Sequence, residues 1–367
     1  MDQIRDIMAN SAIVRLVIVL LLASSGLFAQ SPIKIACIGN SITYGAGMVN
    51  REKNAYPAQL QSMLGDGYEV RNFGVNGTTL LKNGDSPYWN TSEYKNALNY
   101  NADIVFVKLG TNDSKAQNRT HLSDFEKDYH SLISTFQTRN KDVRIILLLP
   151  VPSFSEDSTS IWDPVIKGKI RPLIQKVAYD EGAEVIDLYQ LFVGNPGLFP
   201  DKIHPSSNGA TVIAKRVYES VVQKTENDFN IEEKLGLTEI KESSFHGFKQ
   251  LDFEYNGVAC KIVKPKLTAQ QKPWIWRARF WGHEPQTDLA LLERGFHVVY
   301  CDVANLFGAP EAVLRWNNFY NLMQQAGLSE KVALEGMSRG GLIIYNWATE
   351  NPKKVACIYG DAPVRRK

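Results

Sequence analysis

Hydrophobic residues between positions 33 and 224 form short apolar runs, and the longer segments between them have the apolar spacing of amphipathic helices. Short apolar runs bounded by glycine or polar turns are typical of buried strands. Strands that alternate with helices predict a mostly parallel sheet covered by helices on both faces. The pattern therefore predicts one doubly wound α/β domain, with five parallel strands at 33–39, 68–75, 103–110, 144–150 and 183–189.

A second α/β pattern follows a charged segment. Residues 223–245 are rich in charged side chains and lack a long apolar run, so they predict a linker. Beyond them, the apolar runs 250–255 and 258–265 predict a hairpin, and later runs predict strands separated by helices. Because 367 residues exceed one average domain, we predict a first domain over 30–222 and a second over 246–367.

The N-terminus has the pattern of a secretory signal peptide. Arg5 and Arg15 precede the apolar run 16–23, and small residues follow up to Ala29. The uninterrupted run is far shorter than the ~20 residues that a membrane-spanning helix needs. Residues 1–29 are therefore predicted to be removed on export. We expect a mature protein without a membrane span, in the periplasm or the extracellular space.

The charge balance and the cysteine spacing argue against a nucleic-acid partner and against a metal or redox site. Lys and Arg number 41 against 39 Asp and Glu, and no basic stripe stands out, so no nucleic-acid partner is expected. Cys37, Cys260, Cys301 and Cys357 are widely spaced without a CxxC pair, which predicts buried thiols and no metal or redox site. A disulfide such as Cys260–Cys301 and the oligomeric state both stay open.

Polar residues follow the predicted strands of the first domain at their carboxyl ends. Ser41 follows the first strand, Gly77 the second and Asn112 the third, whereas Asp201 and His204 follow the fifth. Ligands of open parallel sheets bind at this edge, so we expect these residues to gather on one rim. Each also has a structural interpretation. Ser41 alone fits a helix cap, Gly77 a turn, Asn112 a helix cap or a loop contact, and a lone DxxH pair is also common in purely structural turns.

The set contains every group that acyl transfer at a serine requires. Ser41 is the candidate nucleophile, His204 the base, and Asp201 the carboxylate that orients the base. The backbone amides of Ser41 and Gly77, with the side chain of Asn112, are candidate donors of an oxyanion hole. These residues follow the first, second, third and fifth predicted strands in this order, and their joint placement favours a catalytic site over a chance arrangement.

Residues 34–222 resemble the SGNH, or GDSL-like, hydrolase family. The matching blocks are GNSIT around Ser41, NFGVNG ending at Gly77, GTND with Asn112, and DKIHP with Asp201 and His204. The resemblance implies a flavodoxin-like three-layer fold and hydrolysis of esters or thioesters by a Ser-His-Asp mechanism, without metal or cofactor. Asn40 departs from the family, which usually has Asp there, and this puts the fine positioning of the nucleophile in question.

A second serine motif lies in the second pattern. Residues 336–340 read GMSRG, which is G-x-S-x-G between a predicted strand and helix and therefore indicates a nucleophile elbow at Ser338, with the Arg339 amide as an oxyanion donor. Residues 251–363 resemble an α/β-hydrolase, whose acid and histidine follow the elbow. Asp361 is available as an acid, but no histidine follows Ser338. We predict an incomplete, inactive and marginally stable α/β-hydrolase domain.

Two aromatic pairs have different predicted roles. Trp274 and Trp276 share one face of a predicted strand and are expected in the core. Tyr88 and Trp89 lie in a loop near the predicted rim, where they either flank a sugar or pack against the fold.

Export, two hydrolase-like modules and the lack of a cofactor motif resemble bifunctional esterases of bacterial glycan degradation. The leading hypothesis is an exported serine esterase that hydrolyses small acyl esters, above all acetyl esters, on carbohydrates such as O-acetylated sialic acid or plant polysaccharide. One alternative is a lysophospholipase or thioesterase, which needs an apolar acyl groove. Another is a non-catalytic glycan-binding or scaffolding module.

Overall fold

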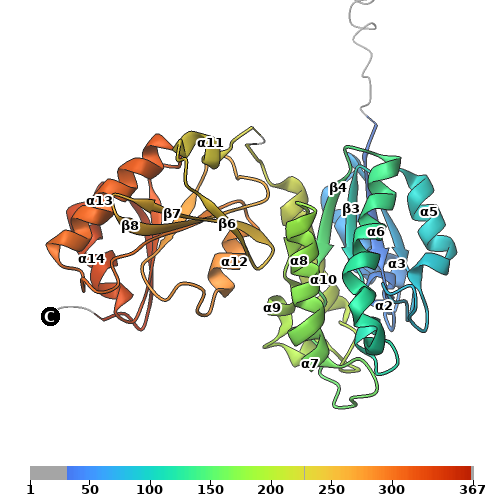
Figure 1. Cartoon of the computed structure of the whole chain (residues 1–367). Coiled ribbons are helices and arrows are strands. Elements are labelled where there is room, and N and C mark those ends of the chain that lie inside the picture. The colour runs from blue at the N-terminus through green and yellow to red at the C-terminus, as the bar shows by residue number, and fades with distance from the viewer. Residues whose placement is uncertain (1–30, 227, 365–367) are drawn as a thin grey trace, which may run out of the picture.

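The computed structural model describes residues 31–226 and 228–364, which form two sheets with their helices (Figure 1). The predicted signal peptide, residues 1–29, lies outside the described residues. Within the described ranges, no helix has both the length and the apolar character needed to cross a membrane.

The first sheet is the predicted five-stranded parallel sheet, with the strand order β2-β1-β3-β4-β5. The strands are β1 (Ile33–Gly39), β2 (Tyr68–Gly74), β3 (Ile104–Lys108), β4 (Arg144–Leu148) and β5 (Glu184–Ile186). Gly39, the last residue of β1, pairs with Gly74 and with Lys108, the last residues of its two neighbours. The turns that follow these strands therefore start at the same level of the sheet.

Helices cover both faces of this sheet, as the alternation in β3 requires. Val105 and Val107 face one apolar cluster, which includes residues of α5, α6 and α8, and Ile104 and Phe106 face another, which includes residues of α4 and α10. The helical elements are α2 (Ser41–Tyr44), α3 (Arg51–Asn54), α4 (Tyr56–Leu64), η1 (Tyr88–Asn90), α5 (Ser92–Tyr100), η2 (Asn112–Ser114), η3 (Arg119–Asp124), α6 (Phe125–Arg139), α7 (Asp163–Val165), η4 (Ile166–Ile170), α8 (Arg171–Asp180), α9 (Leu188–Phe192), η5 (Pro196–Leu198) and α10 (Ser207–Val222). The result is the expected three-layer fold.

The second sheet has seven strands in the order β12-β11-β9-β10-β8-β7-β6. Its strands are β6 (Lys241–Phe245), β7 (Phe248–Tyr255), β8 (Val258–Lys264), β9 (Trp274–Arg277), β10 (His297–Cys301), β11 (Val332–Met337) and β12 (Val355–Asp361). Its helices are α11 (Ile231–Leu235), α12 (Gln286–Leu292), α13 (Pro310–Gln325), α14 (Gly340–Glu350) and η6 (Pro352–Lys354). The predicted hairpin is β7 and β8, and β9 to β12 pair in parallel.

The segment predicted as a linker, 223–245, contains one short helix and one strand. Residues 231–235 form α11, whose Ile231 and Leu235 are buried in the core of the second domain. Residues 241–245 form β6, which pairs with β7. Two apolar residues four positions apart are enough to anchor one helical turn when a partner surface is available, although they do not amount to a long apolar run.

Tryptophans build the core of the second domain, which confirms the prediction for β9. Trp274 and Trp276 are 1% and 0% exposed, and the ring of Trp276 stacks on Trp316 with centroids 3.9 Å apart. The cysteine prediction is wrong at Cys357, which is exposed because β12 lies at one edge of the sheet. Cys260 and Cys301 lie opposite each other in β8 and β10, as free thiols.

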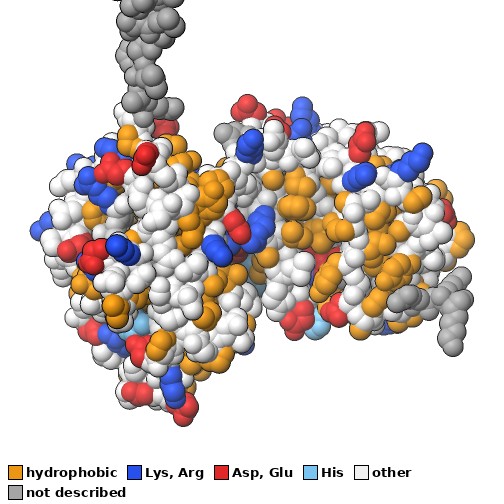
Figure 2. Space-filling model, turned by 180° about the vertical axis from the view of Figure 1, so that it is seen from behind, with side chains coloured by type: hydrophobic (Ala, Val, Ile, Leu, Met, Phe, Trp, Pro, Cys, Tyr) orange, Lys and Arg blue, Asp and Glu red, His pale blue; other side chains and the backbone are white. Residues whose placement is uncertain are grey.

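The two domains share one apolar cluster. Ile174 and Val177 of α8 belong to the same cluster as Phe248 of β7 and Leu292 of α12. Val185 of β5, the edge strand of the first sheet, belongs to the same cluster, and the second domain lies on the side of the first that carries α8 (Figure 1). Seen from behind, acidic and basic side chains gather where the two lobes meet (Figure 2). Covering an edge strand in this way protects its unpaired backbone groups.

Candidate active site

Ser41, His204 and Asp201 form a continuous hydrogen-bonded chain at the carboxyl end of the first sheet. The Ser41 Oγ lies 2.8 Å from the Nε2 of His204, and the Nδ1 of His204 lies 2.6 Å from Asp201 Oδ2. A carboxylate can only accept, so Nδ1 carries the proton and Nε2 is left to accept from the serine hydroxyl. This is the arrangement of a nucleophile, a base and an orienting acid.

The turn after β1 places Ser41 without using it as a cap. Asn40 is the N-cap of α2, because its Oδ1 accepts from the backbone N–H of Ile42 at 3.1 Å. The Nδ2 of Asn40 is buried and has no hydrogen-bond partner among the described residues. Gly39 is required here, since a Cβ would lie 2.3 Å from the Thr43 hydroxyl and 2.7 Å from the Lys108 carbonyl. Ser41 itself is 7% exposed.

Asp201 and His204 are held within one tight turn. The Oδ1 of Asp201 accepts from the backbone N–H groups of Ile203 and His204, at 3.0 and 2.6 Å. Partial burial works against ionisation of Asp201, but the hydrogen bonds from His204 and Ile203 outweigh it and lower the pKa of this carboxyl. The DxxH spacing lets the side chain of Asp201 bond both the backbone and the ring of His204, the candidate base.

The candidate oxyanion donors come from three elements. Ser41 is the first residue of α2, where backbone N–H groups have no acceptor within the helix. Gly77 adopts a left-handed backbone with φ of 76°, which favours glycine. The Nδ2 of Asn112 donates to the carbonyl of Thr78 at 2.9 Å. Asn112 therefore also holds the loop that carries Gly77, and its loop-contact interpretation applies in this structure.

Two residues that the sequence analysis missed fix the same loop. The buried carboxylate of Asp113 accepts from the backbone N–H groups of Leu80 and Leu81, at 3.1 and 2.8 Å. Burial raises the pKa of Asp113 to about 6. Asn118 donates to the Asn112 carbonyl at 2.8 Å. The acid of the GTND block was the available signal for Asp113, whereas Asn118 had none.

Lys108 at the end of β3 is fully buried beneath the rim. Its Nζ contacts the Thr111 hydroxyl at 3.3 Å, and burial lowers the pKa of the amine to about 7. Its backbone carbonyl accepts from Asn40 at 3.4 Å. A lysine at the end of an apolar run is not a strong sequence signal, and it was missed.

The aromatic loop packs against the fold. Tyr88 is 0% exposed and its hydroxyl donates to the Phe73 carbonyl at 2.7 Å, so it does not flank a substrate. The Nε1 of Trp89 donates to the Leu80 carbonyl at 2.7 Å, and Lys82 lies over its ring. Both residues thus support the loop between β2 and β3, and the sugar-contact alternative is wrong for Tyr88.

Ser338 lies in a turn of the expected shape but without a base. Its φ is 48°, its backbone N–H donates to the backbone carbonyl of Asp361 at 2.9 Å, and Arg339 is the N-cap of α14. Across residues 31–226 and 228–364, no hydrogen bond joins Ser338 to a histidine. The nearby charged cluster is structural, because the buried Arg277 pairs with Asp288 and Glu335 at 2.5 and 3.1 Å. In the same ranges no group of three His, Cys, Asp or Glu side chains is arranged to hold a metal ion.

Comparison with known proteins matches residues 37–212 to the GDSL-like Lipase/Acylhydrolase family. An acetylxylan esterase of Xylanibacter ruminicola is 40% identical over 204 residues, which cover 51% of this chain and 42% of that protein. The chain thus spans less than half the length of this curated relative.

Two solved structures are similar to the first domain of this chain. The acetyl xylan esterase AlAXEase is 26% identical with a TM-score of 0.43, covering 52% of this chain and 100% of its own. The carbohydrate acetylesterase Est24 of Sinorhizobium meliloti is 17% identical with a TM-score of 0.42, covering 52% and 98%. Together with the family match and the curated relative, the observed sheet and motif blocks lead to one conclusion: residues 37–212 of this chain are a GDSL-like lipase/acylhydrolase domain.

Proposed function

We propose that this protein is a serine esterase that removes acetyl groups from carbohydrate esters, and that it acts after export, in the periplasm or outside the cell. The observation that carries the proposal is the hydrogen-bonded chain from Ser41 through His204 to Asp201. The 40% identity to an acetylxylan esterase supports the acetyl group and the carbohydrate. The arginines and the apolar run before Ala29 support export.

The acylation step uses the groups in their observed order. His204 takes the proton of the Ser41 hydroxyl as Oγ attacks the carbonyl carbon of the ester. The amides of Ser41 and Gly77 and the side chain of Asn112 stabilise the negative charge on the former carbonyl oxygen. When the bond to the sugar oxygen breaks, His204 returns the proton to that oxygen, which leaves as the sugar hydroxyl.

Deacylation repeats this sequence with water. His204 takes a proton from the water as its oxygen attacks the acetyl group on Ser41. Collapse of the second tetrahedral intermediate breaks the bond to Oγ, His204 returns the proton to Ser41, and acetic acid leaves and ionises to acetate in water. Asp201 stays ionised throughout and stabilises the imidazolium ion.

Acetate release from acetylated xylan oligomers, O-acetylated sialic acid and p-nitrophenyl acetate tests the proposal, with Ser41→Ala as control. We expect release from xylan oligomers to exceed that from sialic acid, and release by Ser41→Ala to fall by about 10⁴-fold. If Ser41→Ala were as active as the wild type, the proposed mechanism would be wrong. If the wild type preferred O-acetylated sialic acid, the proposed substrate would be wrong.

Two further measurements separate the alternatives. A lysophospholipase or thioesterase would prefer octanoyl over acetyl esters, whereas we expect the reverse. A non-catalytic module would leave Ser41 unlabelled by a serine-reactive fluorophosphonate, whereas we expect labelling at Ser41.

A further inference from the structure

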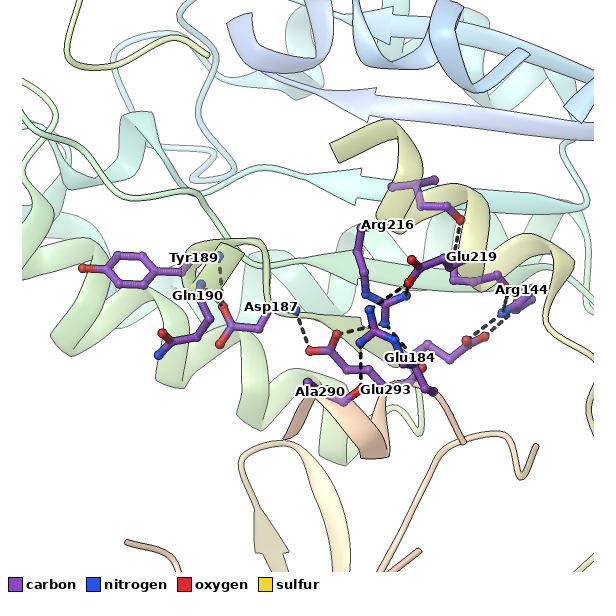
Figure 3. A network of polar contacts seen from close by, with 12 residues as sticks. Arg144, Glu184, Asp187, Tyr189, Gln190, Arg216, Glu219, Ala290 and Glu293 are labelled. Carbon is purple, nitrogen blue, oxygen red and sulfur yellow. Dashed lines mark hydrogen bonds and ion pairs between the residues drawn. The ribbon is translucent and has the colours of Figure 1, made fainter. Parts of the chain in front are cut away.

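Glu293 of the second domain contacts the first domain at two points (Figure 3). Its Oε1 accepts from the backbone N–H of Asp187 at 2.7 Å, and its Oε2 accepts from Arg216 at 2.9 Å. Asp187 follows β5, and Arg216 lies in α10. Asp201 and His204 lie between these positions, so one carboxylate holds the chain on both sides of the candidate acid and base.

These contacts are buried. The side chains of Arg216 and Glu293 are 3% and 6% exposed. Burial raises the pKa of Glu293, while the guanidinium of Arg216 and the N–H of Asp187 favour its charged form. Removing one partner of a buried pair leaves the other charge without compensation, so the junction depends on both.

The contact at Asp187 continues toward the candidate site through packed groups. The Oδ1 of Asp187 accepts from the backbone N–H of Tyr189 at 3.0 Å and so caps α9. Phe192 at the end of α9 packs edge-on against Phe199, with ring centroids 5.3 Å apart. The Phe199 carbonyl accepts from the backbone N–H of Lys202, inside the Asp201–His204 turn, at 3.0 Å.

The contact at Arg216 fixes the other side of the turn. Arg216 belongs to α10, whose N-cap Ser206 is two residues after His204. The Ser206 backbone N–H donates to the Leu198 carbonyl at 2.7 Å, and its hydroxyl accepts from Gly209. The position of α10 therefore limits where the imidazole of His204 can lie.

We propose that Glu293 is a positioning residue for the Asp201–His204 turn, and that the second domain thereby forms part of the esterase without supplying a reacting group. The proposal rests on the proposed function of Ser41, Asp201 and His204. Small displacements of a base relative to its nucleophile lower the rate of the chemical step more than they weaken substrate binding.

The test is Glu293→Gln in the full chain. Glutamine keeps the size of the side chain and an acceptor for Asp187, but it loses the ion pair with Arg216. We expect kcat on p-nitrophenyl acetate to fall about tenfold with KM within about twofold. Hydrogen exchange should accelerate at amides 188–206 and stay unchanged in β1 and β3. Glu293→Asp keeps the charge but is too short to make both contacts, so kcat should fall less than in Glu293→Gln. This variant replaces Glu293→Gln in the test if Glu293→Gln does not fold.

Arg294→Ala is the matched control, because Arg294 bonds Glu219 at the exposed rim of the same junction. It should leave kcat and exchange unchanged. Unchanged kcat in Glu293→Gln, or exchange that accelerates uniformly over the first domain, would overturn the positioning role. If the wild type has no esterase activity while amides 188–206 still respond selectively, the proposed function fails and the structural contact stands.

Discussion

Two serines of this molecule, Ser41 and Ser338, lie where a parallel strand leads into a helix, and they differ both in backbone conformation and in what surrounds them. Ser41 is the first residue of α2, which follows β1 closely, whereas Ser338 lies in the turn between β11 and α14 with a φ of 48°. The hydroxyl of Ser41 reaches His204 at 2.8 Å, whereas in the described part of the chain no histidine bonds Ser338. A strand-turn-helix can expose a hydroxyl, but a nucleophile also needs a base brought from elsewhere in the fold.

Two buried basic side chains, Arg277 of the second domain and Lys108 of the first, differ in a similar way. Arg277, in the second domain, has two carboxylate partners, Asp288 and Glu335. Lys108, in the first domain, has the hydroxyl of Thr111 as its side-chain contact among the described residues. The charge of Arg277 is thus compensated by carboxylates, whereas the amine of Lys108 lies beneath the rim without a carboxylate partner among the described residues.

The largest expected effect separates the two serines. Ser41→Ala should lower kcat/KM for p-nitrophenyl acetate by about 10⁴-fold, because the proposed nucleophile is lost, while Ser338→Ala should change it less than about twofold. Initial rates and the melting temperature of both variants check this. A measurable loss of activity in Ser338→Ala would mean that a base reaches Ser338 and would remove the contrast.

Trp276→Ala tests how strongly the two domains depend on each other. Removing a fully buried indole that stacks on Trp316 should cost about 4 kcal/mol in the free energy of unfolding. Because the domains share an apolar cluster, loss of near-UV circular dichroism and loss of esterase activity should shift together in urea. Activity that persists after the circular dichroism signal is lost would show that the domains unfold independently.

Asp201→Asn tests whether the Asp201 carboxylate orients His204 and stabilises its protonated form. The amide keeps the shape of the side chain but removes the charge that stabilises protonated His204, so kcat should fall about 10²-fold with little change in KM. The side chain of Asp201 is 55% exposed, which favours a smaller loss than for a buried acid. Steady-state kinetics check this, with melting temperature as the control. A kcat within twofold of the wild type would contradict the orienting role.

Lys108→Met tests the uncompensated amine through its pH dependence. The pKa in the folded state, about 7, lies below the unfolded value of 10.5, so the folded protein binds fewer protons between these values. Stability should therefore rise with pH from about 7 to 10.5, and the cost of the buried amine is complete below pH 7. Lys108→Met should stabilise the protein by about 2 kcal/mol at pH 7 and remove part of this rise. Urea midpoints at pH 7 and 9 measure both effects; destabilisation at pH 7 would show that the bond to Thr111 is worth more than the burial cost.

The sequence predicted the elements of the first domain because its signals are local. Apolar runs bounded by turns correspond to β1 to β5, and the blocks after them identified Ser41, Asp201 and His204 as a candidate site that the structure brings together. The predictions that were wrong, for residues 231–235 and for Tyr88, have one cause. Whether 231–235 forms a helix, or Tyr88 faces solvent, depends on the surface that packs against it.

The order of elements along the chain, the turn residues and the candidate acid, base and nucleophile were thus determined by the sequence, because periodicity and turn chemistry act over a few residues. The tertiary structure alone decided which serine has a base, which buried charge has a partner, and that Glu293 meets Asp187 and Arg216. Those partners are 106 and 77 positions away along the chain. These contacts form only when the packing of the two domains buries the partner groups together. No local sequence pattern predicts that joint burial.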